Sequence, residues 1–153
     1  MASANLAIVR SFTLKYWFDT EKITDVERLL KEFADTHPRA PIRVGGFGSF
    51  PPNVVFIDVQ LSDEAKKIFG YLIAELKTID WMPWDRYDAE NLHFHATIAE
   101  ECNEKFSDIW YYVQGKEKYF DTYFDNITIL RATKRVKNYD KYEMHKIFIL
   151  GQE

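Results

Sequence analysis

Hydrophobic positions recur along the chain with two different periods, which indicates a fold built from both helices and strands. A helical spacing predicts a first helix that begins at a capping box formed by Thr24 and Glu27 and stops before Pro38. A second helix is expected after Ser62, with an apolar stripe that is typical of a core face: Ala65, Ile68, Phe69, Leu72, Ile73 and Leu76. A third helix is expected around 103–114.

Segments rich in apolar and β-branched residues predict strands between these helices. The expected strands are 6–18, 42–50, 54–61, NLHFHATIAE at 91–100, and two final segments around 119–132 and 141–150. Glycines in IRVGGFGSF indicate a bulge or a close approach to the backbone. The order β-α-β-β-α-β-α-β-β is typical of an α+β fold. A weak repeat between SFTLKYWF and HATIAEEC further suggests two similar lobes that face each other across a cleft.

Composition indicates an ordinary globular domain and limits the class of partner. The 153 residues suffice for one well-packed domain, with 46% hydrophobic and 16% aromatic residues. A net charge of −4 does not favour a long nucleic-acid duplex, whose phosphates attract basic proteins. A nucleic-acid partner would be short, held by the local patch in RATKRVKNYDK that contains Arg131, Lys134 and Arg135. A solvated loop between strands is the other interpretation of this patch.

The location is expected to be cytoplasmic. Cys102 is the single cysteine and cannot form an intramolecular disulfide, which indicates a reducing compartment. No apolar run reaches the length of a membrane span, and the N-terminus lacks the apolar region of a signal peptide.

The stretch NLHFHATIAE carries the candidate chemistry. Successive side chains of a strand point to opposite faces, so His93, His95 and Thr97 are expected to share one face. Three interpretations are open. The imidazoles could be merely solvated; they could bind a metal, although no third protein ligand is evident; or they could serve phosphate chemistry. In the last case an imidazole moves a proton and a threonine hydroxyl donates to a phosphoryl oxygen.

The motif His95-Ala96-Thr97-Ile98 resembles the second H-x-T-hydrophobic motif of the two-histidine (2H) phosphoesterase superfamily. That superfamily includes 2′-5′ RNA ligase-like proteins and RNA 2′,3′-cyclic phosphodiesterases. GFGSFPPNVVFIDV (46–59) is similar to the strand pair before its middle helix, and the resemblance extends from about residue 11 to the C-terminus. It implies a bilobal fold in which two pseudo-symmetric lobes surround a central groove, and catalysis without metal or cofactor. One histidine would act as base and one as acid, while the threonines hold the phosphate. His95 and Thr97 match one motif, and Thr13 matches the other threonine.

Two departures from this pattern affect the expected activity. Ser11 occupies the position of the other histidine, and a serine cannot titrate near neutral pH. Losing one general acid or base costs about 10²–10⁴ in rate. His93 would approach phosphorus from the same side as His95, so we do not expect it to replace the missing histidine. Only ten residues precede Ser11, so the strand and helix that usually precede the first motif are expected to be absent. An exposed sheet edge and self-association would follow.

We therefore expect a single domain, 1–153, that is a metal-independent phosphodiesterase for 2′,3′-cyclic phosphate RNA ends or 2′-5′ linkages, impaired by the serine. The expected site residues are Ser11, Thr13, His95 and Thr97, with Arg131, Lys134 and Arg135 contacting the substrate. The alternative is a non-catalytic protein of the same fold that binds a nucleotide or RNA end, in which Trp81, Trp84 or Tyr87 could stack a base. A metal-binding or purely structural domain is the third possibility.

Overall fold

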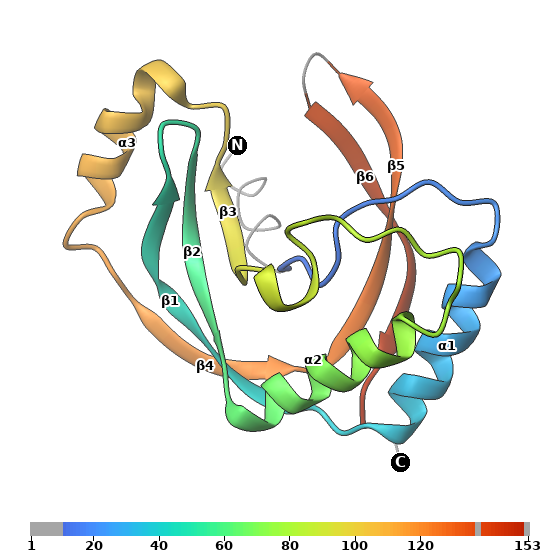
Figure 1. The fold of residues 1–153 in the computed structure, drawn as a ribbon. Helices are drawn as coiled ribbons and strands as arrows, with labels where there is room; N and C mark the ends of the chain where they lie inside the picture. The colour runs from blue at the N-terminus through green and yellow to red at the C-terminus, as the bar shows by residue number, and fades with distance from the viewer. Residues whose placement is uncertain (1–10, 137–138, 152–153) are drawn as a thin grey trace.

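The computed structural model describes residues 11–136 and 139–151, without the side chains of 133–141 (Figure 1). The helices in this part of the chain are α1 (Ile23–Thr36), α2 (Asp63–Leu76) and α3 (Phe106–Val113). Its strands are β1 (Ala40–Phe50), β2 (Val54–Leu61), β3 (His95–Ala99), β4 (Tyr119–Phe124), β5 (Asn126–Val136) and β6 (Tyr139–Ile149). Short 3₁₀ turns at Ala89–Asn91 and Asn103–Lys105 precede β3 and α3.

The strands form two antiparallel sheets of unequal size. Among the described residues, one sheet has four strands in the order β3-β2-β1-β4, and β5 and β6 pair as a long hairpin. Figure 1 shows α1 and α2 together at the base of the molecule, and α3 beside the turn between β1 and β2. Helices combined with antiparallel sheets confirm the predicted α+β class.

Helix α2 forms as its sequence predicts. The hydroxyl oxygen of Ser62 accepts a hydrogen bond from the backbone N–H of Ala65 at 3.1 Å, which caps the first turn. The predicted apolar stripe is buried against the four-stranded sheet and α1, apart from Phe69, which is half-buried.

Helix α1 also ends before Pro38, but its predicted capping box is wrong. The helix begins at Ile23 and its N-cap residue, Lys22, makes no side-chain cap. Glu27 instead bonds to β6, where Nε2 of His145 and Nζ of Lys146 donate to its carboxylate at 2.6 and 2.8 Å. The carboxylate of Glu27 therefore joins α1 to β6 and does not cap its own helix.

The glycines of β1 form the expected bulge. Register between β1 and β2 shifts between Val44 and Phe47, and Gly46 has a φ of +77°. A Cβ on Gly45 would lie 2.3 Å from the carbonyl oxygen of Lys118, so the chain passes too close for any side chain there.

Two predicted strands differ from the structure. Residues 11–18 form no strand, and residues 6–10 of that prediction lie outside the described part. The segment 119–132 is divided at Asp125 into β4 and β5, which belong to different sheets. Lys134 and Arg135, which were expected in a loop after residue 132, are consequently part of β5.

Candidate functional site

His95 and Thr97 lie on β3 and share one face of the four-stranded sheet. His95 is paired with Asp58 and Thr97 with Phe56 on the neighbouring strand β2. Ala96 between them is 3% exposed and faces the core, so strand alternation directs the imidazole and the hydroxyl away from the core. The predicted common face of these two residues is confirmed.

The His95 ring has a defined tautomer. Its Nδ1 lies 2.6 Å from the carbonyl oxygen of His93. Because a carbonyl oxygen can only accept, Nδ1 carries the proton of this bond, and the neutral ring keeps its lone pair at Nε2. The ring is therefore arranged to accept a proton at Nε2.

His93 lies next to His95, although it precedes β3 and is not on the strand. The two ring centroids are 5.7 Å apart. The Nε2 atom of His93 is bonded at 3.1 Å to a carboxylate oxygen of Asp58, and both side chains are partly open to solvent. This pair fixes the position of the second imidazole at the site.

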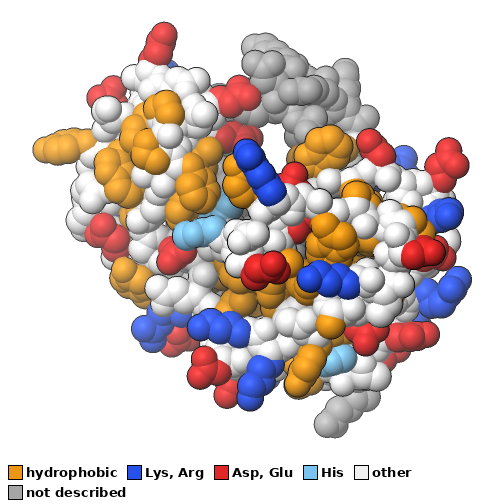
Figure 2. Space-filling model, viewed as in Figure 1, with side chains coloured by type: hydrophobic (Ala, Val, Ile, Leu, Met, Phe, Trp, Pro, Cys, Tyr) orange, Lys and Arg blue, Asp and Glu red, His pale blue; other side chains and the backbone are white. Residues whose placement is uncertain are grey.

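Two phenylalanines surround the imidazoles. Phe56 is buried, with its ring centroid 4.9 Å from that of His95. Phe50, at the end of β1, is 42% exposed, and its centroid lies 5.2 Å from that of His95. Figure 2 shows exposed histidine side chains beside β3, and hydrophobic side chains next to them that cover the β1–β2 turn and α3. Neither phenylalanine was predicted from the sequence. For Phe56 the available signal was Gly48, whose missing Cβ leaves space for its ring.

The segment that carries Ser11 and Thr13 lies next to the start of β3. The rings of Phe12 and Phe94 meet edge to face, with their centroids 5.8 Å apart. Ser11 and Thr13 are exposed, whereas Phe12 between them is half-buried. The structure thus brings the two predicted motifs to neighbouring positions, without the strand that the sequence predicted for 11–18.

Asp88 anchors the same segment. Its carboxylate is almost fully buried and accepts hydrogen bonds from Nζ of Lys15 and from the backbone N–H groups of Tyr16 and Asp85, each at 2.8 Å. Burial alone would raise the pKa of Asp88, but the bonds from Lys15 and the two N–H groups outweigh it, so the pKa lies below its ordinary value. This anchor joins the loop before β3 to the chain just after Thr13.

The predicted basic patch lies on the β5–β6 hairpin. Arg131 is exposed, and its Nε lies 3.6 Å from a carboxylate oxygen of Glu143 on β6. Lys134 and Arg135 are also on β5, and their side chains lie outside the described part. Contact of these three residues with a substrate stays a prediction.

The aromatic residues of the loop before β3 have different surroundings. Nε1 of Trp81 donates to a carboxylate oxygen of Asp25 on α1 at 3.0 Å. Trp84 lies beneath the ammonium group of Lys15, 4.5 Å from its ring centroid. Tyr87 is 49% exposed. Both tryptophans therefore connect this loop to other segments, while Phe50 and Phe56 contact the ring of His95.

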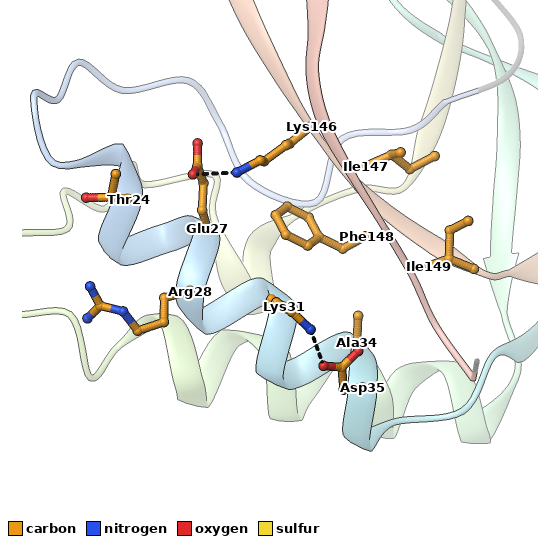
Figure 3. A pocket seen from close by; sticks show the side chains of 10 residues that line it. All are labelled: Thr24, Glu27, Arg28, Lys31, Ala34, Asp35, Lys146, Ile147, Phe148 and Ile149. Atoms are coloured by element: carbon orange, nitrogen blue, oxygen red, sulfur yellow. Dashed lines mark hydrogen bonds and ion pairs between the residues drawn. The ribbon is translucent and has the colours of Figure 1, made fainter. Parts of the chain in front are cut away.

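A hollow between α1 and β6 is visible in Figure 3, where Lys146 reaches Glu27 across it. Hydrogen bonds from Lys146, and next from His145, lower the pKa of Glu27. A second hollow lies between α1 and the end of α2. Neither of these two hollows is lined by His95 or Thr97.

Among the described side chains, which exclude those of 133–141, no three from His, Cys, Asp or Glu are grouped so that they could hold a metal ion. None of the helices among the described residues could span a lipid bilayer.

Comparisons with known proteins identify the family. The crystal structure of TT0787 of Thermus thermophilus is similar, with a TM-score of 0.64 and 18% sequence identity over 91% of this chain and 76% of that chain. At this identity the likeness concerns the fold. No curated protein sequence matches the chain. The family model described as the 2′-5′ RNA ligase superfamily matches residues 12–135, which include Thr13, His95 and Thr97. The chain belongs to the 2′-5′ RNA ligase superfamily.

Proposed function

We propose that this protein is a metal-independent phosphodiesterase whose His95 and Thr97 bind one phosphoryl group of a 2′,3′-cyclic phosphate RNA end or a 2′-5′ linkage. The hydrogen bond from Nδ1 of His95 to the carbonyl oxygen of His93 carries the proposal, because it makes Nε2 the proton acceptor. Thr97 presents its hydroxyl on the same face of β3. Membership of the superfamily supports the class of substrate.

The reaction needs one base and one acid. A water molecule attacks phosphorus while Nε2 of His95 takes its proton, so the new P–O bond forms on the side of β3. The bond from phosphorus to the ribose oxygen breaks, and that oxygen takes a proton from solvent water because Ser11 is too weak an acid to supply one. His95 then releases its proton to solvent. Without a second histidine, we expect turnover about 10²–10⁴ slower than with a complete pair.

The hydroxyls of Ser11 and Thr13 would donate to the phosphoryl oxygens. Both residues are exposed, and the Phe12–Phe94 contact holds their segment beside β3. Arg131, on β5, would contact the RNA beyond the cleaved bond through its exposed guanidinium group.

A second function, binding without turnover, is favoured by one observation. Ser11 and Thr13, the exposed residues of the segment 11–14, carry hydroxyl groups, and these do not titrate near neutral pH. In that case the site would hold a nucleoside 2′-phosphate or a cyclic phosphate through the same residues and release it unchanged.

The test is hydrolysis of adenosine 2′,3′-cyclic monophosphate in the presence of a chelator. We expect slow turnover by the wild type, loss of it in His95→Ala, and a gain of about 10²–10⁴ in Ser11→His. Ser107→His, at an exposed serine of α3, is the matched control and should leave the rate unchanged.

The outcomes distinguish the two functions and can refute both. Binding without turnover, converted to turnover by Ser11→His, would establish the second function. Turnover that survives His95→Ala would refute both.

A further inference from the structure

We infer that Phe50 binds the base of the substrate by stacking, so that the site selects nucleoside phosphates over phosphodiesters without a base. This inference rests on the proposed function, since it concerns the group attached to the phosphate at His95.

The position of Phe50 supports a ligand contact. Its ring meets those of His93 and His95 edge to face, with centroid distances of 5.6 and 5.2 Å, and is still 42% exposed. An exposed ring beside two imidazoles offers an apolar face next to the proposed phosphate site, to which the base of a ligand can bind. In a nucleoside 2′,3′-cyclic phosphate the base is one ribose ring away from phosphorus. A phosphate at Nε2 of His95 therefore places the base within reach of the neighbouring ring.

The exposed ring of Phe50 packs against the buried ring of Phe56. Phe56 is 4% exposed and lies 4.7 Å from Phe50 between ring centroids. Phe56 in turn lies across the backbone of Gly48, where a Cβ would come within 2.3 Å of its ring. The turn after β1 is closed by a hydrogen bond from the N–H of Asn53 to the carbonyl oxygen of Phe50 at 3.0 Å. The exposed ring is thus held in place before the ligand arrives, which lowers the entropy cost of stacking.

Stacking on an aromatic ring predicts a particular selectivity. Every base has a π-face, so all four nucleotides should bind, and the larger purines should bind more tightly than the pyrimidines. Replacing the ring by a methyl group should weaken binding of a nucleoside phosphate by about 5- to 150-fold. A phosphate without a base should not respond to the same change.

The experiment compares two probes: adenosine 2′,3′-cyclic monophosphate and the 2′,3′-cyclic phosphate of methyl riboside, in which a methoxy group replaces the base. Dissociation constants are measured by calorimetry, and KM and kcat are measured where turnover is detected. Phe50→Ala removes the ring and Phe50→Trp keeps an aromatic face. Tyr71→Ala, at a tyrosine of α2 that is 55% exposed beside His37, is the matched control.

We expect Phe50→Ala to raise the dissociation constant or KM of the adenosine probe while leaving kcat and the methyl riboside probe unchanged. Phe50→Trp should retain the wild-type preference, and Tyr71→Ala should have no effect. An equal change for both probes, or none, overturns the inference and leaves the proposed function standing, provided that binding still depends on His95. If neither probe binds to the wild type, the inference and the proposed function are both refuted.

Discussion

Asp88→Asn is expected to destabilise the protein strongly, because it removes the negative charge from a buried ion pair. The side chain of Asp88 is 1% exposed and that of Lys15 is 10% exposed, with 2.8 Å between the charged atoms. The asparagine side chain would turn N–H donors toward the ammonium group of Lys15 or toward the N–H groups that Asp88 now accepts from.

The magnitude follows from this burial. Removing one partner of a buried pair costs about 3–5 kcal/mol, against a total free energy of unfolding of about 5–15 kcal/mol for a domain. Asp35→Asn is the matched control, because Asp35 and Lys31 form a pair of similar length whose side chains are 59% and 70% exposed. Losing that exposed pair should cost only a small fraction of what Asp88→Asn costs, because solvent screens it. Lys15→Met in the Asp88→Asn background should recover part of the loss, since no buried charge then remains unpaired.

Urea denaturation followed by tryptophan fluorescence measures these differences. The pKa of Asp88 is lowered in the folded state, so its contribution is present above the ordinary aspartate pKa and disappears as the pH falls through the lower folded value. The wild type should therefore lose stability in this acid range more steeply than Asp88→Asn. A cost below about 1 kcal/mol for Asp88→Asn, or one equal to that of Asp35→Asn, would refute the reasoning.

Three further predictions concern the sheets. Asp58→Ala should cost at most about 1 kcal/mol by urea denaturation, because the Asp58–His93 pair is open to solvent; a cost like that of a buried pair would contradict this. Gly48→Ala should cost about 1–3 kcal/mol, since its Cβ would strike the buried ring of Phe56, and an unchanged unfolding midpoint would show that this ring moves freely. The outer face of the β5–β6 hairpin carries exposed apolar side chains, with Met144 at 64%, so we expect self-association that Met144→Glu abolishes. Sedimentation showing a monomeric wild type at all concentrations would contradict it.

Local patterns predicted the elements that depend on neighbouring residues. Helix α2 follows from its cap at Ser62 and its apolar stripe, and the face shared by His95 and Thr97 follows from strand alternation. The bulge in β1 follows from its glycines. In each case the sequence signal lies within a few residues along the chain, although the contact that uses it can be distant, as that of Gly45 with Lys118 is.

Long-range contacts decided the elements that were predicted wrongly. The segment 11–18 has the composition of a strand, but Lys15 and Tyr16 are held by Asp88, over 70 residues away, and no strand pairs with 11–18. Glu27 bonds to His145 at a separation of 118 residues instead of capping its own helix. A single sequence contains no local signal for either contact.

The candidate site was predictable only in part. The motif at His95 and Thr97 indicated where a phosphate could bind, while the bond that sets the His95 tautomer depends on the backbone carbonyl of His93, which lies before the strand. Phe50 and Phe56 belong to different strands, and the pairing of β2 with both β1 and β3 brings their rings to the imidazole of His95. Base stacking was instead predicted for the aromatic loop before β3, because that loop is nearer to His95 along the sequence.

The most direct test of the phosphate site is a ¹H–¹⁵N NMR spectrum of the His95 ring, recorded with and without adenosine 2′-monophosphate. The structure predicts a ring protonated at Nδ1 in the free protein, with this proton bonded to the carbonyl oxygen of His93. Addition of the nucleotide should shift the Nε2 resonance and leave the Nδ1 proton in place. A free ring protonated at Nε2, or an Nε2 resonance that does not move at saturating nucleotide, would contradict the account.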